Sequence, residues 1–276
     1  MDKGPPVIRL AVFGKPVSQS LSPRIHGLFA EQLGLRVDYR AIEATPETFP
    51  NQVGQLVAAG GRGCNITVPL KRIAWEMAAE SSRRARRAQA ANTLIFGSQG
   101  DMFAENTDGQ GLVNDLLSLP DVRVKGARIC LLGAGGAAAG VLGALLDAQP
   151  QWVVVANRSA ARAQELADRH HDLGEVHVCQ PADIAQRAPI DLLINATSQG
   201  HGGAAPAVSA DWFAPGGSCY DLNYGAAAAP LRRACEAINI AYADGLGMLV
   251  GQAALSFELW TGRAPDPGAV LKELRR

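Results

Sequence analysis

Short apolar runs and longer stretches of helical periodicity alternate along the first third of the chain. The runs are rich in Val, Ile and Leu, whereas in the stretches between them apolar residues recur every three or four positions. These two periods are typical of strands and of amphipathic helices. Ser22 is the expected N-cap of the first helix. The pattern predicts strands at 7–13, 37–42 and 64–68, and helices at 23–33, 46–59 and 70–79.

Residues 93–105 interrupt this alternation. Two apolar runs, 93–96 and 102–105, flank the sequence Gly-Ser-Gln-Gly-Asp. Two strand-like runs joined by a short glycine-containing loop predict an antiparallel hairpin. The first region therefore combines parallel βα units with one antiparallel excursion.

The second half of the chain has a different pattern. Its apolar runs at 129–132, 153–155, 192–194 and 219–222 are continuous and lack polar alternation. Continuous runs are typical of parallel strands that helices cover on both faces. The final stretch, 247–260, predicts a helix that packs back on the first region. Its expected core stripe is Met248, Leu249, Leu255 and Leu259.

These elements predict an α/β fold of two domains. The first is an N-terminal α/β substrate domain with a mostly parallel sheet, covering 1–108 and completed by 247–276. The second, 109–246, is a doubly wound domain. With 276 residues, of which 47% are apolar and 19% charged, the chain can bury a substantial core for both.

Charge and cysteine usage narrow the class of protein. The formal net charge is zero, which argues against nucleic acid or a membrane surface as the main partner. No stretch resembles a membrane span or a secretion signal, and the odd count of five cysteines suits a reducing cytoplasm. The five histidines show no metal-ligand spacing, so we expect no metal. The basic run 83–87 predicts a solvated helix face.

A glycine-rich turn at residues 132–140 is the first candidate site. It follows an apolar run and opens an Ala/Leu-rich helical stretch, and Gly133, Gly135 and Ala138 match the dinucleotide-binding fingerprint. Backbone N–H groups at such a turn approach a pyrophosphate, which the helix N-terminus favours. A glycine pattern alone also fits a turn that binds nothing. The flanking strand and helix favour the dinucleotide site.

The residues after the next predicted strand indicate which dinucleotide. The fingerprint places a ribose-binding carboxylate there, but this chain has Asn157 and Arg158, with Arg162 one helical turn later. Arginine attracts a 2′-phosphate, which a carboxylate would repel. Two surface arginines can also be simple solvated charge. After this turn they favour NADP over NAD.

Polar residues in the first region form a second candidate site. Asn65 and Thr67 share one face of a predicted strand, and Lys71 follows in the opening turn of a helix. A lysine there opposes the helix dipole, so a structural role is poorly supported. The alternative is a surface lysine whose stem covers apolar area. The residue type and its position in the sequence do not favour either interpretation over the other.

Further polar residues in separate segments complete this candidate site. Asp108 lies between the hairpin and the next helix, either as a carboxylate at the domain junction or as part of a helix cap. Gln252 interrupts an apolar stripe, where a buried amide needs partners. Hydroxyls, amides, a lysine and a carboxylate together suit a small polyhydroxylated acid. The other members are Asn92 at the start of the hairpin and Ser20 and Ser22 on a loop before a helix.

In these motifs, and in their order along residues 13–262, the chain resembles the shikimate dehydrogenase family. Any one motif could arise by chance, but their joint order and spacing could hardly do so. The motifs are Ser-Leu-Ser-Pro at 20–23, Asn-Ile-Thr-Val-Pro-Leu-Lys at 65–71, Asn-Thr at 92–93, Asn-Thr-Asp-Gly at 106–109, Gly-Ala-Gly-Gly at 133–136, Asn-Arg at 157–158, Asn-Ala-Thr-Ser at 195–198, and Asp-Gly-Leu-Gly-Met-Leu-Val-Gly-Gln at 244–252.

The resemblance implies reversible NADPH-dependent reduction of 3-dehydroshikimate to shikimate in aromatic amino acid biosynthesis. It implies a Rossmann domain for NADP, and a monomer or homodimer in the cytoplasm. Lys71 would act as acid and base, positioned by Asp108. Ser20, Ser22 and Tyr224 would hold the substrate carboxylate, and Asn65, Thr67, Asn92, Asp108 and Gln252 the ring hydroxyls. The cofactor would contact Gly133, Ala134, Gly135, Gly136, Ala137, Asn157, Arg158, Arg162, Thr197, Gly245 and Met248.

Two positions depart from the family pattern, and three other functions remain open. Ala139 stands where many relatives carry arginine, and Gln19 where a histidine often precedes the first serine. The alternatives are a quinate/shikimate dehydrogenase that prefers NAD, a non-catalytic NADP-binding sensor, and a folate-linked dehydrogenase. Arg158 argues against the first, and the presence of Lys71 and Asp108 against the second. The paired serines and Gln252 argue against the third.

Overall fold

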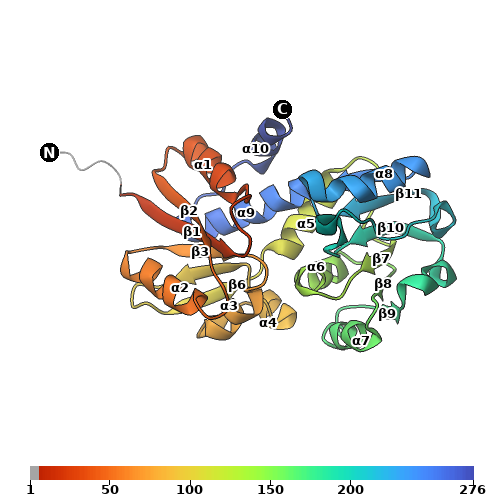
Figure 1. Ribbon diagram of the computed structural model, residues 1–276, viewed down its shortest axis with the longest axis horizontal. Helices are drawn as coiled ribbons and strands as arrows, with labels where there is room; N and C mark the ends of the chain where they lie inside the picture. Colours follow the sequence, from red (N-terminus) through yellow and green to blue (C-terminus); the bar gives the residue numbers. More distant parts are fainter. Residues whose placement is uncertain (1–5) are drawn as a thin grey trace. The chain divides into compact units, whose positions relative to one another are not determined.

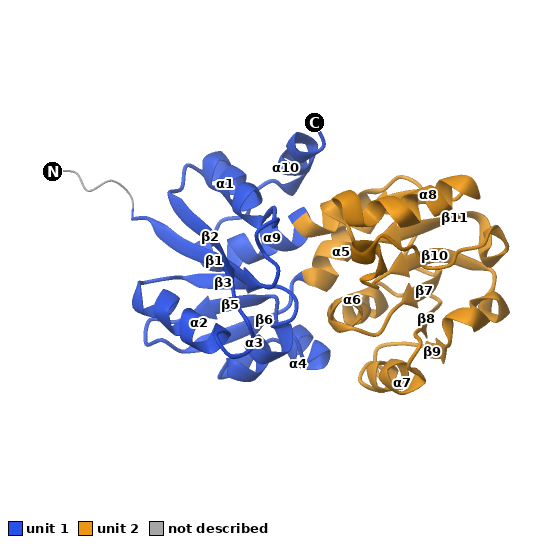
Figure 2. Cartoon of the chain, viewed as in Figure 1, with its two compact units in different colours: residues 1–107, 250–276 blue, residues 108–249 orange. Residues whose placement is uncertain are grey.

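The structure is a computed structural model that describes residues 6–276, divided into two compact units (Figure 2). Unit 1 contains the chain up to Thr107 together with Val250–Arg276, and unit 2 is Asp108–Leu249. Helix α9 (Leu246–Thr261) spans the second change of unit. Each unit has its own sheet.

Unit 1 is built on a six-stranded sheet of order β2-β1-β3-β5-β6-β4. Strand β1 pairs in parallel with β2 and β3, whereas β3, β5 and β6 pair antiparallel. The predicted mostly parallel sheet and the hairpin are therefore confirmed. The pattern missed β4, which has two residues and pairs in parallel with β6. The strands are β1 Ile8–Gly14, β2 Val37–Glu43, β3 Gly63–Ile66, β4 Glu80–Ser81, β5 Thr93–Phe96 and β6 Met102–Glu105.

Helices cover both faces of this sheet (Figure 1). On one face, Phe49 of α2 and Leu70 next to α3 pack against Phe13 and Ile66. On the other face, the rings of Phe29 in α1 and Phe257 in α9 lie 5.6 Å apart. The helices are α1 Ser22–Leu33, α2 Phe49–Ala58, α3 Lys71–Met77, α4 Arg83–Ala88 and α10 Pro267–Leu274, with the C-terminal part of α9.

Unit 2 contains six parallel strands in the order β12-β11-β10-β7-β8-β9. The chain starts in the middle with β7, runs to one edge, and returns beside β7 to build the other half. This is the predicted doubly wound topology. The four predicted strands are present, and the two edge strands β9 and β12 were missed. The strands are β7 Arg128–Leu132, β8 Trp152–Ala156, β9 Val176–Cys179, β10 Ile190–Asn195, β11 Phe213–Asp221 and β12 Ala241–Asp244.

Alternate residues of the unit 2 strands enter two separate cores. In β7, Ile129 and Leu131 pack with Leu112 of α5, whereas Cys130 packs with Leu231 of α8. Both sheet faces are thus apolar, which explains the continuous runs in the sequence. The helices are α5 Asp108–Ser118, α6 Gly136–Asp147, α7 Ala160–Asp168 and α8 Ala229–Ala237, with 3-10 turns at Pro181–Arg187, Gln199–Gly202, Ala210–Trp212 and Gly225–Ala228.

The predicted N-cap at Ser22 is wrong. Leu21 already has helical backbone angles, and the N–H of Ile25 donates to its carbonyl at 2.9 Å. Ser22 is consequently the first residue of α1. The hydroxyl that accepts a hydrogen bond at this helix start is that of Ser20, from the Ser22 N–H at 3.2 Å.

The predicted apolar stripe of the last helix is also wrong. Leu259 is 44% exposed, and Leu249 and Leu255 are only partly buried. Met248 is buried, but it belongs to unit 2. Large aliphatic residues suggested the wrong face because alanines and aromatic residues do the packing. The buried positions of α9 in unit 1 include Val250, Ala253, Phe257 and Trp260.

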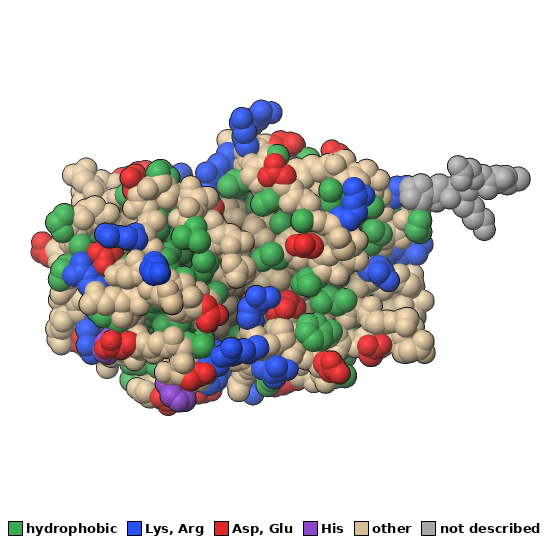
Figure 3. All heavy atoms as spheres, turned by 180° about the vertical axis from the view of Figure 1, so that it is seen from behind, with side chains coloured by type: hydrophobic (Ala, Val, Ile, Leu, Met, Phe, Trp, Pro, Cys, Tyr) green, Lys and Arg blue, Asp and Glu red, His purple; other side chains and the backbone are tan. Residues whose placement is uncertain are grey.

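The surface of the described chain is mixed in charge. Figure 3 shows basic and acidic side chains interspersed over the visible face. No helix within residues 6–276 is both long and apolar enough to cross a membrane. Within the same residues, no group of three or more His, Cys, Asp or Glu side chains is placed to hold a metal ion.

Candidate active site

The end of β3 places Thr67 and Lys71 close to the hairpin in unit 1. The strand ends at Ile66, one residue before Thr67, but the Thr67 N–H still donates to Phe13 O at 2.8 Å. Lys71 lies in the opening turn of α3, as predicted, although the helix begins at Lys71 itself rather than at residue 70, and its carbonyl accepts from Ala91 N at 2.8 Å. This bond ties the first turn of α3 to the residue that precedes Asn92.

Asn65 lies in the middle of β3 and is 5% exposed. Its Oδ1 accepts from Tyr39 Oη at 2.7 Å and lies 3.1 Å from His26 Nε2. Its Nδ2 donates to Asn92 O at 3.2 Å and to Ser256 Oγ at 3.1 Å. An amide oxygen accepts two hydrogen bonds and an amide nitrogen donates two. The polar capacity of this side chain is therefore taken up by protein partners.

His26 is fully buried behind Asn65. Its ring stacks on Tyr39 at 4.2 Å, and Phe29, Phe257 and Trp260 surround it. Burial lowers the pKa of His26 from 6.5 to about 3, against a smaller opposing effect of the hydrogen bond to Asn65. The imidazole is therefore neutral at ordinary pH.

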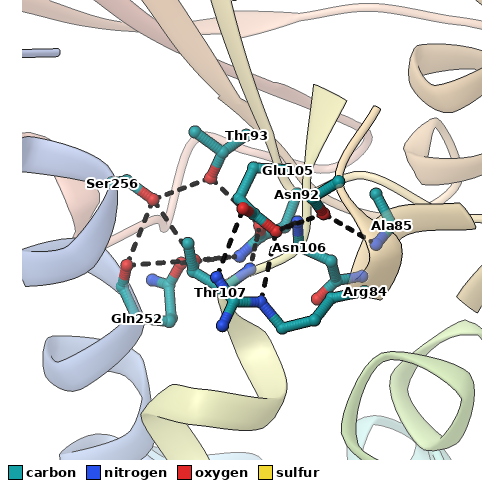
Figure 4. A network of polar contacts seen from close by, with 10 residues as sticks. Arg84, Ala85, Asn92, Thr93, Glu105, Asn106, Thr107, Gln252 and Ser256 are labelled. Carbon is teal, nitrogen blue, oxygen red and sulfur yellow. Dashed lines mark hydrogen bonds and ion pairs between the residues drawn. The ribbon is translucent and has the colours of Figure 1, made fainter. Parts of the chain in front are cut away.

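Asn92, Thr107 and Gln252 form one buried network in unit 1 (Figure 4). The Asn92 Nδ2 donates to Thr107 Oγ1 at 2.8 Å and to Gln252 Oε1 at 3.0 Å. The Thr107 N–H donates back to Asn92 Oδ1 at 2.9 Å. The structure thus brings together two predicted substrate-binding amides from segments 160 residues apart.

The segment before Asp108 is held by a buried carboxylate. Glu105 is 6% exposed and accepts from Ser82 Oγ at 2.6 Å and from the Asn106 N–H at 2.8 Å. Arg84 of α4 pairs with it at 3.2 Å. The basic run was predicted to be a solvated face, and Arg84 shows that it also anchors this segment.

Asp108 is the first residue of α5 and the first of unit 2, directly after Thr107. A carboxylate in the first turn interacts favourably with the helix dipole, and Asp108 is 5% exposed. Gly109 follows it where α5 crosses α6. A Cβ at Gly109 would lie 2.7 Å from the Gly140 carbonyl oxygen, so the close approach requires glycine.

The glycine turn of unit 2 has the predicted geometry. Gly133 follows β7 with φ +111°, a value that favours glycine, and its position packs against Ala196 after β10. Gly135 precedes the first residue of α6, and apart from adjoining residues and the backbone of α6 no described atom lies within 4 Å of a Cβ built at Gly135 or Gly136. The turn lies between β7 and β10, where the strand order reverses and where doubly wound sheets bind ligands.

The proposed 2′-phosphate residues follow β8. Asn157 Nδ2 donates to Ser159 O at 2.9 Å, and the Ser159 hydroxyl caps α7 by accepting from the Arg162 N–H. The Arg158 and Arg162 residues are exposed. Ala139 is 7% exposed and packs in the core of unit 2, so its methyl group contributes to packing.

Hydrogen bonds and close backbone packing hold the remaining cofactor candidates in place. Thr197 donates from N and Oγ1 to Asn195 Oδ1 at 3.0 and 2.7 Å. The Met248 N–H donates to Tyr220 Oη at 3.3 Å, and that hydroxyl donates to Asp115 Oδ2 at 2.6 Å. A Cβ at Gly245 would lie 2.4 Å from Leu222 O. Tyr224 is partly buried, and burial raises its pKa.

Sequence patterns missed several residues that organise these sites. Ser256 was detectable, because it lies four residues after Gln252 on one face of an otherwise apolar helix. His26, Tyr39 and Tyr220 gave no signal, since aromatic residues are common in any core. Cys64 is buried, which raises the pKa of its thiol and disfavours the nucleophilic thiolate.

The parallel sheet, its strand order and the glycine turn define a dinucleotide-binding α/β protein of the Rossmann class. The chain matches the family models described as the shikimate dehydrogenase substrate binding domain at residues 12–94, shikimate / quinate 5-dehydrogenase at 116–202 and the shikimate 5′-dehydrogenase C-terminal domain at 245–275. It belongs to the shikimate dehydrogenase family.

Known proteins resemble the chain over nearly its whole length. It is 46% identical to the shikimate dehydrogenase (NADP(+)) of Methylococcus capsulatus, covering 96% of this chain and 95% of that protein. The enzyme of the same description from Marinobacter nauticus is also 46% identical, covering 96% and 97%. The crystal structure of the shikimate 5-dehydrogenase of Thermus thermophilus in complex with NADP(H) and shikimate superposes with a TM-score of 0.83 at 34% identity, covering 98% and 99%.

Proposed function

We propose that this chain is an NADP-dependent shikimate dehydrogenase that reversibly reduces 3-dehydroshikimate to shikimate. One observation carries the proposal. Unit 1 holds a buried network of side-chain amides, and the Lys71 carbonyl bonds the residue before Asn92 of that network, whereas unit 2 holds a glycine turn followed along the chain by Arg158. The reaction needs both a polyol site and a dinucleotide site.

The substrate-binding roles are assigned residue by residue. Ser20 and Ser22 hold the carboxylate with Tyr224. Asn92 was expected at a ring hydroxyl, but its amide groups bond Thr93, Thr107 and Gln252, so we assign it the task of orienting Gln252. The ring hydroxyls bind Thr67, Asp108 and Gln252. Asn65 was expected among the latter. Because its amide groups already bond protein partners, we assign it the task of ordering the neighbouring side chains instead.

The cofactor site is assigned to unit 2. The open surface at Gly135 and Gly136 and the N-terminus of α6 fit a pyrophosphate, because no side chain at these positions blocks the approach. Asn157, Arg158 and Arg162 hold the 2′-phosphate. Gly133, Ala134, Ala137 and Thr197 line the turn, and Gly245 and Met248 lie at the nicotinamide.

Lys71 supplies the proton chemistry. When bound, NADPH supplies the hydride for the substrate carbonyl. The Lys71 ammonium stabilises the developing negative charge on the carbonyl oxygen and donates the proton that completes the hydroxyl. Asp108 positions the lysine and the reacting hydroxyl. In the reverse direction the neutral amine accepts that proton.

The assignment of location and assembly belongs to the same proposal. The odd number of cysteines suits the reducing cytoplasm. A monomer or homodimer that acts on a small molecule, without nucleic acid or membrane, is consistent with the balanced charge.

Initial rates with four substrate pairs test the proposed function. Shikimate with NADP⁺ should exceed shikimate with NAD⁺, quinate with NADP⁺ and quinate with NAD⁺ by orders of magnitude. A preference for quinate with NAD⁺ would instead identify the protein as a quinate/shikimate dehydrogenase that prefers NAD. If the protein bound NADPH but turned over none of the four pairs, it would be a sensor rather than an enzyme.

Substitution of Lys71 tests the chemistry. The Lys71→Ala variant should lose at least about 10²-fold in kcat, because a proton donor contributes about 10²–10⁴-fold. The affinity for NADPH, measured by fluorescence titration, should stay unchanged. Arg72→Ala, at the exposed next position of α3, is the matched control and should retain normal turnover. Near-normal turnover of Lys71→Ala would remove the lysine from the mechanism.

A further inference from the structure

Backbone geometry fixes the orientation of the Asn92 side chain. The Thr107 N–H can only donate, and it lies 2.9 Å from Asn92 Oδ1. Thr93 Oγ1 donates to the same oxygen at 3.0 Å. The amide oxygen of Asn92 therefore faces these two donors, and its nitrogen faces the other way. An inverted amide would bring its own N–H groups against the Thr107 N–H, which can only donate.

The orientation of Asn92 in turn fixes that of Gln252. Asn92 Nδ2 donates to Thr107 Oγ1 at 2.8 Å and to Gln252 Oε1 at 3.0 Å. Since a planar amide carries its oxygen and nitrogen on opposite sides, the Nε2 of Gln252 is directed away from Asn92. Gln252 thus presents N–H groups rather than a carbonyl on its outer side.

Thr107 and Ser256 brace this arrangement. The hydroxyl of Thr107 accepts from Asn92 Nδ2 and donates to the Gln252 backbone carbonyl at 3.1 Å. The Ser256 hydroxyl is fully buried, lies 2.7 Å from Thr93 Oγ1 and accepts from Asn65 Nδ2 at 3.1 Å. The Ser256 hydroxyl also donates to the Gln252 backbone carbonyl at 3.1 Å, so Thr107 and Ser256 both bond the backbone at Gln252.

We propose that Thr107 and Ser256 are positioning residues that hold Gln252 in a single orientation, so that its Nε2 donates a hydrogen bond to a ring hydroxyl oxygen of the substrate. The inference rests on the proposed function, which places Gln252 at a substrate hydroxyl. It adds the direction of that hydrogen bond and the two residues that set it. All residues of the network belong to unit 1 (Figure 4).

Steady-state kinetics of Thr107→Val and Thr107→Ser test the proposal. Valine has nearly the shape of threonine but no hydroxyl, so KM for shikimate should rise about tenfold, the effect of one lost hydrogen bond. The values of kcat and of KM for NADP⁺ should change less than about twofold. Thr107→Ser keeps the hydroxyl and should restore KM to near the original value. Ser256→Ala leaves the hydrogen bonds among Thr107, Asn92 and the Gln252 side chain in place, so its KM should rise only about threefold.

Deoxy analogues of shikimate identify the hydrogen bond itself. Each analogue lacks one of the ring hydroxyls that do not react. For the analogue that lacks the hydroxyl bound to Gln252, the original enzyme and Thr107→Val should have equal KM values. In Gln252→Glu, a carboxylate oxygen can still accept the hydrogen bond from Asn92 Nδ2, but the side chain has no N–H group to donate to the substrate. It should therefore also raise KM for shikimate and lose its preference for shikimate over that analogue.

Three results would overturn the proposal. One is a Thr107→Val enzyme with reduced thermal stability but an unchanged KM per active molecule, determined by titrating active sites. Another is a Thr107→Ser enzyme as impaired as Thr107→Val. The third is a Gln252→Glu enzyme that binds shikimate normally. Failure of the proposed function is distinct, because the original protein would then fail to oxidise shikimate with NADP⁺.

Discussion

Asn65 illustrates how little the identity of a single polar residue reveals about its task. Its place on one strand face with Thr67 made it a candidate, and the family resemblance implied that its side chain binds substrate. In the structure its Oδ1 accepts a hydrogen bond from Tyr39 Oη and lies against His26 Nε2, and its Nδ2 donates to Ser256 Oγ. Buried amides with all groups paired stabilise one arrangement of their neighbours. The residue therefore fixes the positions of its neighbours in unit 1 rather than binding the substrate itself.

Arg158 provides a residue-scale test of cofactor choice. Arg158→Ala should raise KM for NADP⁺ about tenfold or more, because a charge-assisted hydrogen bond to the 2′-phosphate is lost. KM for NAD⁺, which lacks that phosphate, should not rise. Arg232→Ala, exposed on α8 of the same unit, is the control. An equal loss of affinity for NADP⁺ and NAD⁺ would show that Arg158 does not contact the phosphate.

His26 makes the stability of the protein depend on pH. Burial holds its folded pKa at about 3, below the ordinary 6.5, so between these values the unfolded chain binds more protons. Its contribution is complete above pH 6.5 and is lost as pH falls toward 3, by about 1.4 kcal/mol per unit. The aromatic neighbours do not ionise in this range, and burial raises the pKa of Tyr39.

Urea unfolding between pH 4.5 and 6.5 measures this dependence. The free energy of unfolding of His26→Gln should change less steeply with pH than that of the original protein. His171→Gln, at an exposed position, should keep the original slope. Equal slopes for His26→Gln and the original protein would mean that His26 does not titrate with folding.

At the scale of elements, the pattern of apolar residues predicted strands best where both faces are covered. The four central strands of unit 2 enter two cores and were found. The edge strands β9 and β12 have mostly half-buried residues, so their sequences lack a continuous apolar run. The ends of elements were predicted less accurately than their presence. Strand β3, for example, ends at Ile66 rather than at residue 68.

The crossing of α5 and α6 gives an element-scale prediction. Gly109→Ala should lower the free energy of unfolding by about 1–3 kcal/mol, because the new methyl group would meet the backbone of α6. Gly54→Ala is the matched control. Gly54 is exposed inside α2, and a Cβ built there would meet no described atom outside the adjoining residues and the backbone of α2, so alanine should stabilise by about 0.5–1 kcal/mol. Urea titration measures both, and a stabilised Gly109→Ala would contradict the close approach.

At the scale of the whole molecule, the two units differ in how the chain builds them. Unit 2 is one continuous segment with its own six-stranded sheet. Unit 1 is discontinuous, because its core needs Phe257 and Trp260 from the C-terminal segment. An independently folding region needs its own complete core.

Fragments test this difference. Residues 108–249 alone should melt cooperatively by circular dichroism and bind NADPH by fluorescence. Residues 1–107 alone should show no cooperative transition, and adding 250–276 through a flexible linker should restore one. Cooperative melting of 1–107 without the C-terminal segment would contradict the role of α9 in the core.

The sequence by itself determined the α/β class, the doubly wound order of unit 2, the hairpin and the glycine turn. Each depends on local periodicity or on backbone conformations that only certain residues adopt. Only the tertiary structure decided that Thr107, Ser256 and Asn92 brace Gln252, and that Asn65 faces His26. Those contacts join residues far apart in the chain, and hydrogen-bond direction depends on geometry that no sequence pattern records.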